Sequence, residues 1–127
     1  MTRLPVEMES IENVSNAKRL MELFGIRHVP VMRGSGIFGI VSQRDLLNAE
    51  MKAGHNIDDQ SIDDICQKDV LAVPPMMPVD EVAQKMLDRR VGSAVVKDGG
   101  FVVGIYTSSD AFKTLCQVFG KRKSSST

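Results

Sequence analysis

Two heptapeptides with one shared pattern offer the clearest chemistry in this chain. Residues 39–45 (Gly-Ile-Val-Ser-Gln-Arg-Asp) and 104–110 (Gly-Ile-Tyr-Thr-Ser-Ser-Asp) both read Gly-x-x-[Ser/Thr]-x-x-Asp. Each follows an apolar run of strand type and enters a helix, so the hydroxyl and the carboxylate can form a capping box. The same geometry suits a ligand, because a helix N-terminus offers N–H groups to an anion and a carboxylate accepts from a diol. Capping and ligand binding can therefore coexist at both places.

A glycine motif just before the first heptapeptide invites a different interpretation. Residues 34–39 (Gly-Ser-Gly-Ile-Phe-Gly) form a literal GxGxxG, and Asp58 and Asp59 lie near the acidic spacing of a dinucleotide site. That fingerprint requires its glycines to end a strand and open a helix. Here they run into 37–41, which has the pattern of a strand. We interpret the motif as a hairpin turn followed by a packing glycine.

The elements around the heptapeptides repeat at a constant offset of 65 residues, the distance from Asp45 to Asp110. Without a gap, this offset aligns apolar residues with apolar residues and turn glycines with turn glycines. The aligned pairs include Val14 with Val79, Met21 with Met86, Val31 with Val96 and Gly34 with Gly99. The sequence therefore predicts two copies of one supersecondary unit.

Each copy is predicted to run helix, strand, strand, helix, which makes the fold α/β. Apolar side chains at helical spacing mark the first helices, at 17–24 and at 82–87, with Asp80 as the predicted N-cap of the latter. Glycine-containing turns separate the strands of each predicted hairpin, 28–32 with 37–41 and 93–96 with 101–106. The second helices are predicted at 45–52 and 110–119.

The repeat predicts the domain organisation. The first repeat takes residues 1–53, and the counterpart of 61–65 is missing from it because Met1 aligns with Cys66. Residues 54–60 form a linker, and the second repeat takes 61–120, opening with a short helix capped by Ser61 and a short strand at 70–73. The polar residues 121–127 are expected to be a mobile tail.

Composition narrows the function classes. The 127 residues carry 16 basic and 16 acidic side chains, so a basic nucleic-acid footprint is not expected. No apolar run approaches the roughly 18 residues of a membrane helix, and no secretion signal is recognisable. Cys66 and Cys116 form no CxxC and no metal-ligand cluster, which favours a reduced, cytoplasmic setting and predicts no metal site.

Catalysis finds little support in the sequence. There is no HExxH, GxSxG or P-loop motif, and neither cysteine has a neighbouring histidine in the chain. The acidic pairs at 58–59 and 63–64 lie in polar connections and are expected to be solvated. We therefore predict that the chain is not an enzyme.

These motifs, in this order and in duplicate, give the chain a family resemblance. Residues 25–31 (Gly-Ile-Arg-His-Val-Pro-Val) followed by 39–45, and more weakly 91–96 followed by 104–110, resemble the cystathionine beta-synthase (CBS) domain pair, or Bateman module. Residues 61–66 resemble the segment that usually opens such a repeat. The resemblance implies two repeats packed sheet to sheet about a pseudo-two-fold axis, with two related clefts.

The resemblance also implies a ligand class and its binding residues. CBS clefts bind AMP, ADP or ATP, and in some members S-adenosylmethionine, NAD or cyclic dinucleotides, without a required cofactor. The motif aspartate takes the ribose hydroxyls, and the hydroxyl residue before it contacts phosphate or ribose. Carried over by position, Asp45 and Ser42 serve one cleft, with Arg27, His28 and Arg44 toward phosphate, and Asp110, Thr107 and Ser109 serve the other. The backbone near 91–93, which includes Gly92 and Ser93, and near 69–71 would hold the adenine of the first cleft.

The two copies differ in charge. Arg27 and His28 align with Gly92 and Ser93, and Arg44 aligns with Ser109. Charge-assisted donors are about twice as strong as neutral ones, so we predict the tighter nucleotide site at Asp45. His28 as an ordinary strand histidine remains an equal alternative to a phosphate contact.

The function predicted from these points is a regulatory module that senses an adenine nucleotide, with AMP, ADP or ATP ranked above S-adenosylmethionine and NAD. Modules of this family usually pair through their helices, so a homodimer is expected, along with a regulated partner domain or protein. The alternative is a ligand-free dimerisation module whose aspartates only cap helices. Such a module could be a piece of a larger enzyme or transporter. Nucleic-acid binding ranks last.

Overall fold

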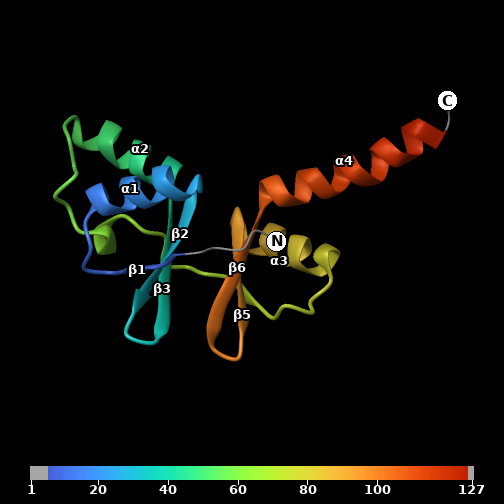
Figure 1. The fold of residues 1–127 in the computed structure, drawn as a ribbon, viewed down its shortest axis with the longest axis horizontal. Helices are drawn as coiled ribbons and strands as arrows, with labels where there is room; N and C mark the ends of the chain where they lie inside the picture. Colours follow the sequence, from blue (N-terminus) through green and yellow to red (C-terminus); the bar gives the residue numbers. More distant parts are fainter. Residues whose placement is uncertain (1–5, 126–127) are drawn as a thin grey trace. The chain divides into compact units, whose positions relative to one another are not determined.

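The computed structural model describes residues 6–125, with side chains up to residue 120, as two compact units (Figure 1). The first unit ends at Val70 and the second begins at Leu71. Each unit has its own three-stranded sheet and its own helices, so the predicted α/β class is confirmed.

The first unit is built around a sheet in the order β1-β2-β3. Strand β1 runs parallel to β2, and β2 runs antiparallel to β3. Its elements are β1 (Met8–Glu9), α1 (Val14–Phe24), β2 (His28–Arg33), β3 (Gly36–Ser42), α2 (Gln43–Ala53) and a short 3-10 helix η1 (Ile62–Asp64).

The second unit has the same topology, with sheet order β4-β5-β6. Strand β4 is parallel to β5, and β5 is antiparallel to β6. Its elements are β4 (Ala72–Val73), α3 (Val79–Arg89), β5 (Ser93–Asp98), β6 (Phe101–Thr107) and α4 (Ser108–Ser125).

Strand register confirms the duplication residue by residue. The hairpin of the first unit pairs His28 with Ser42, and that of the second pairs Ser93 with Thr107, which is the same pair 65 positions later. The ladder irregularity falls after Val31 in one hairpin and after Val96 in the other, again 65 positions apart. A shared register and a shared bulge are what two copies of one unit require.

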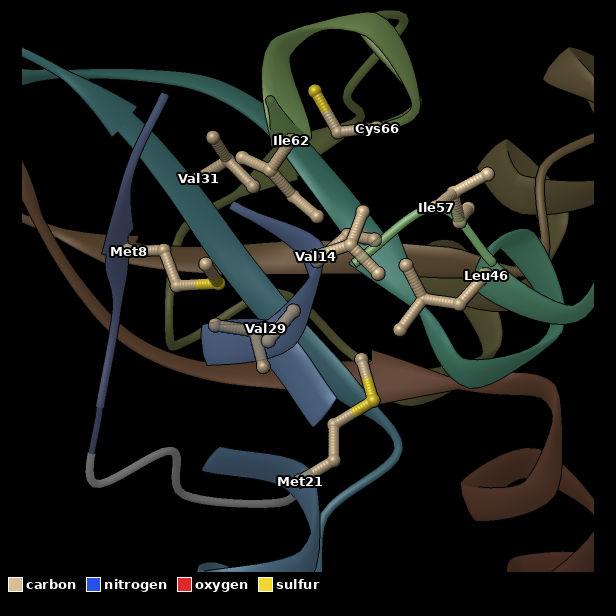
Figure 2. Packing of buried hydrophobic residues seen from close by; sticks show 11 residues of the cluster. Met8, Val14, Met21, Val29, Val31, Leu46, Ile57, Ile62 and Cys66 are labelled. Carbon is tan, nitrogen blue, oxygen red and sulfur yellow. The ribbon is translucent and has the colours of Figure 1, made fainter. Parts of the chain in front are cut away.

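Buried side chains from α1, α2, η1 and all three strands form the core of the first unit, so both α-helices pack against its sheet (Figure 2). The 11 residues of this cluster are Met8, Val14, Ala17, Met21, Val29, Val31, Val41, Leu46, Ile57, Ile62 and Cys66. Seven buried residues form the core of the second unit: Leu71, Val73, Val82, Met86, Ala94, Val96 and Tyr106. Of the described hydrophobic residues of α4, only the partly buried Ala111 packs against this core.

Compact units and sequence repeats divide the chain at different places. The sequence repeat assigns residues 61–70 to the second copy and 54–60 to a linker, whereas the first unit extends to Val70. The physical reason is burial, because Ile57, Ile62 and Cys66 lie in the core of the first unit. Figure 2 shows Ile57 near Leu46, Ile62 near Val14, and Cys66 near Ile62.

Several element boundaries differ from the predictions: α1 and α3 each start three residues early, and β4 is limited to two residues. Helices α2 and α4 start two residues early, directly after Ser42 and Thr107, and α4 continues to Ser125 instead of ending near 119. The residues predicted as a tail, 121–127, therefore begin inside a helix, because Lys and Arg at 121–123 are good helix formers. Residues 126 and 127 lie outside the described residues. Strand β1 was not predicted, because two residues are too few to show a period.

The predicted N-cap of α3 is wrong. Pro78 takes the cap position, with a φ of −58° and a ψ of 144°, and Asp80 lies in the first turn. Proline suits a helix start because its fixed φ is compatible with entry and its missing N–H needs no partner. Asp80 still places negative charge at the positive end of the helix dipole.

Candidate functional site

The junction between β3 and α2 places Ser42 and Asp45 in a reciprocal capping box. The Asp45 N–H donates to Ser42 Oγ at 3.0 Å, and the Ser42 N–H donates to Asp45 Oδ2 at 2.9 Å. Both side chains are half-buried. The predicted capping geometry is confirmed, and it fixes the Asp45 carboxylate at the start of the helix.

His28, the first residue of β2, and Arg27 directly before it lie at the same end of the sheet. His28 lies opposite Ser42 in the ladder, and the Gln43 N–H donates to the Arg27 carbonyl at 2.9 Å. Arg44 occupies the first turn of α2. Arg27 and Arg44 are exposed and His28 is half-buried. The structure therefore gathers all five predicted residues of the first copy at one sheet end, and we refer to them below as the Asp45 cluster.

Sequence reasoning missed Gln67. Its side-chain Nε2 donates to Asp45 Oδ1 at 3.2 Å, although 22 residues separate the two. The backbone of Gln67 forms a bridge with Ile40, with N–O distances of 2.9 and 2.8 Å. Only the tertiary path of residues 65–70 reveals this contact, and no local pattern signals it.

The second copy has an equivalent capping arrangement. The Asp110 N–H donates to Thr107 Oγ1 at 3.3 Å, and the Thr107 N–H donates to Asp110 Oδ2 at 2.9 Å. The Ser108 N–H donates to the Gly92 carbonyl at 3.1 Å, and Ser93 lies opposite Thr107. These residues and the exposed Ser109 occupy the positions predicted from the offset, and we call them the Asp110 cluster.

Charge distinguishes the two clusters. The Asp45 cluster carries two guanidinium groups and an imidazole, whereas the aligned positions of the Asp110 cluster hold glycine and two serines. Arginine offers planar, permanently charged donors that match phosphate geometry. The Asp45 cluster is therefore the better equipped of the two for an anionic ligand.

The GxGxxG segment forms a hairpin turn and a strand, as predicted. Gly34 adopts a φ of 63° in the turn, and β3 starts at Gly36. A Cβ on Gly39 would lie 2.6 Å from the Gln67 carbonyl oxygen and 2.9 Å from Cys66 Sγ. Gly39 is thus a packing glycine, and no helix opens at this motif.

Two carboxylates that we expected to be solvated are paired. Lys18 Nζ bonds Asp58 Oδ1 at 2.7 Å and also contacts Glu50, and Arg33 bonds Asp63 Oδ2 at 3.0 Å. The bond with Lys18 lowers the pKa of Asp58, and the bonds with both acids raise the pKa of Lys18. Both carboxylates stay partly exposed, so the pairing exists beside the expected solvation. The pairs were not predicted because the partners lie at least 30 residues away in the chain.

Neither a reactive thiol at Cys66 nor a metal site is found among the described residues. Burial raises the pKa of the Cys66 thiol, which disfavours the nucleophilic thiolate. Among residues 6–125, no group of three or more His, Cys, Asp or Glu side chains is placed to hold a metal ion. Over the same part of the chain, no helix combines the length and apolar character needed to cross a bilayer.

Comparison with known proteins decides the family. A model described as CBS domain matches residues 1–52 and 62–116. The chain belongs to the CBS domain family. The two matches coincide with the two sequence repeats, so the chain is a CBS pair, and a CBS pair is a regulatory module.

Relatives include enzymes that match this CBS pair over a small part of their length. The inosine-5'-monophosphate dehydrogenase of Korarchaeum cryptofilum is 30% identical over 112 residues, which are 87% of this chain and 22% of that protein. The L-aspartate semialdehyde sulfurtransferase of Methanocaldococcus jannaschii is 28% identical, over 97% of this chain and 23% of that protein. The chain thus spans less than a quarter of these curated relatives.

Solved CBS structures have the same fold over nearly the whole chain. AcuB from Vibrio cholerae, a protein with a proposed role in acetoin utilization, is 31% identical with a TM-score of 0.73, covering 98% of this chain and 92% of its own. The CBS domain pair of protein MJ0100, solved with 5'-methylthioadenosine and S-adenosyl-L-methionine, is 25% identical with a TM-score of 0.74. That match covers 90% of this chain and 93% of the other.

Proposed function

We propose that this CBS pair senses an adenosyl ligand, with AMP, ADP or ATP favoured, and that the Asp45 cluster holds it. The observation that carries the proposal is the gathering of a capped carboxylate, two arginines and a histidine at one helix N-terminus. The adenosyl compounds bound to the MJ0100 pair support the ligand class.

Each part of the cluster has a chemical task in this proposal. Asp45 accepts hydrogen bonds from the two ribose hydroxyls, and Ser42 contacts ribose or phosphate. Arg27 and Arg44 supply charge-assisted donors to phosphate, which are about twice as strong as neutral ones. The Asp110 cluster lacks these charges and is proposed to bind more weakly, or to take a less charged adenosyl compound.

A thermal-shift panel tests the proposal. AMP, ADP, ATP, S-adenosylmethionine and NAD are added separately to the purified chain. A ligand at 100 times its Kd adds about 2.7 kcal/mol of stability, a rise of several degrees in Tm for a domain of this size. The Asp45→Ala variant should lose most of that rise. No shift with any compound would contradict a sensor of this ligand class.

A dimerisation module that binds no ligand is the second candidate. Helix α4 exposes large apolar side chains at positions three and four residues apart, Phe112, Leu115 and Phe119, each more than half exposed in the described chain. Such a stripe suits pairing with a second copy. Sedimentation of the Leu115→Glu variant next to the parent chain tests it: a dimer that becomes a monomer supports pairing through α4, and a parent chain that is monomeric removes this candidate.

A further inference from the structure

We propose that Gln67 is the positioning residue of the ligand site, holding the Asp45 carboxylate in the orientation that accepts a ribose diol, and that Gly39 is required because it admits the backbone that carries Gln67. The inference rests on the proposed function, since it assigns a role toward the same ligand. It adds a residue from outside the Gly-x-x-Ser-x-x-Asp motif, and it gives the motif glycine a physical task.

The backbone at Gln67 is held firmly enough to position another group. Gln67 N–H donates to the Ile40 carbonyl at 2.8 Å, and Ile40 N–H donates to the Gln67 carbonyl at 2.9 Å. Ile40 belongs to β3, the strand that ends at Ser42. One strand therefore carries both the cap of α2 and the attachment point of Gln67.

Close approach at Gly39 makes this attachment possible. A Cβ there would stand 2.6 Å from the Gln67 carbonyl oxygen, a distance that real Cβ atoms essentially never show. Since the clashing atom is backbone, the segment would have to move. Gly39, which opens the motif six residues before Asp45, thus leaves room for the backbone of Gln67.

The hydrogen bonds on Asp45 leave the acceptor capacity that a diol needs. Ser42 N–H occupies one site on Oδ2, and Gln67 Nε2 occupies one site on Oδ1. Each carboxylate oxygen accepts about two hydrogen bonds, so each keeps one site. Two neighbouring ribose hydroxyls can then donate to the two oxygens, and the carboxylate loses no rotamer freedom on binding because it is already fixed.

Three substitutions at Gln67 separate its donor from its bulk. The side chain is exposed, so all three variants should fold. Gln67→Met keeps the length of the side chain and removes the hydrogen-bond donor. Gln67→Glu replaces the donor with a negatively charged acceptor that repels Asp45, and Gln67→Lys supplies a donor again. The probes are AMP, ATP and 5'-methylthioadenosine, each measured beside its 2'-deoxy counterpart, because only the pair of ribose hydroxyls engages both oxygens.

The readout is the ratio of affinities for the ribose and 2'-deoxy forms. Gln67→Met should lower that ratio by about 3- to 10-fold, the range of one hydrogen bond, with little change for the deoxy form. Gln67→Glu should lower it further, and Gln67→Lys should restore it. A merely structural role would change both forms equally and leave the ratio constant.

Failure of the inference can be told apart from failure of the proposed function. If Asp45→Ala abolishes the preference for ribose and Gln67→Met leaves it intact, the positioning role is overturned while the ligand site stands. A higher affinity for the ribose form in Gln67→Met would also overturn it, since Gln67 would then compete with the diol. If the parent chain binds none of the probes, both proposals fall together.

Discussion

At the residue scale, one carboxylate serves several partners at once. Asp45 completes the cap of α2, accepts a hydrogen bond from Gln67 and, in our proposal, binds the ribose. These roles are compatible because each carboxylate oxygen of Asp45 accepts one hydrogen bond from the protein and can accept one more. The carboxylate is thus organised by the fold before a ligand arrives.

Arg27 should contribute to phosphate binding and little to adenosine binding. It is exposed and lies beside the cap of α2, so Arg27→Ala should not disturb the fold. Removing a charge-assisted bond should lower the affinity for ATP by roughly 10- to 100-fold. The affinity for adenosine should change by less than about twofold. Titration calorimetry with both compounds checks this, with Arg89→Ala, an exposed arginine at the end of α3, as the matched control. An equal loss of affinity for ATP and for adenosine would show that Arg27 does not contact the phosphate.

Tyr106→Phe should stabilise the chain. The Tyr106 hydroxyl is buried and has no hydrogen-bond partner among the described residues, and the side chain lies in the apolar core of the second unit. Removing an unsatisfied buried hydroxyl while keeping the ring should add about 1 kcal/mol. The equivalent position in the first unit is Val41, which is wholly apolar. Urea unfolding measures the difference, and a loss of stability would mean that an ordered water satisfies the hydroxyl.

At the scale of the element, local signals predict the parts that local interactions build. Apolar spacing, turn glycines and capping motifs predicted the hairpins and the starts of the four α-helices to within three residues. Strand β1 and the contact of Gln67 with Asp45 depend on where distant segments meet, and no periodicity encodes that. The ion pairs of Asp58 and Asp63 were not predicted for the same reason, since their partners Lys18 and Arg33 lie at least 30 residues away.

Gly39→Ala should destabilise the first unit by about 1–3 kcal/mol, the usual cost of overpacking. The added methyl group meets the Gln67 backbone, which is also bonded to Ile40. Gly36→Ala is the matched control, because it lies on the same strand and its nearest neighbour would be at 3.9 Å. Chemical unfolding of both variants decides the matter; equal stabilities for the two would show that the segment at 65–70 yields easily.

Lys18→Met should destabilise the first unit in a pH-dependent way. Lys18 ties α1 to α2 and to the connection at 54–60 through Glu50 and Asp58. The pKa of Asp58 is lowered, so its contribution is complete above its ordinary value of 3.8 and is lost as the pH falls through the folded pKa. The difference between parent and variant should therefore be present at pH 7 and shrink in acid. A difference in stability that does not change with pH would assign the effect to packing of the lysine stem. Because the charged groups are partly exposed, high salt should also reduce the difference in stability.

At the scale of the whole molecule, the duplication produces two similar capped junctions, β3 with α2 and β6 with α4, which differ in charge. Both repeats keep the hydroxyl, the aspartate and the strand register, whereas only the first keeps the basic residues. The duplication and the family could be predicted from the sequence, because the offset of 65 preserves both motif and turns. The extent of the first unit could not, since burial of Ile57, Ile62 and Cys66 decides it.

The most direct test of the central claim is titration calorimetry of AMP and ATP against the parent chain, Asp45→Ala and Asp110→Ala. Both substitutions remove the same capping position, at a similar cost to their helices, so a difference between them reports on the ligand. We predict that Asp45→Ala weakens the tighter binding event by at least about 10-fold, whereas Asp110→Ala changes it by less than about threefold. Equal effects of the two substitutions, or an affinity that Asp45→Ala leaves unchanged, would contradict the assignment of the ligand to the Asp45 cluster.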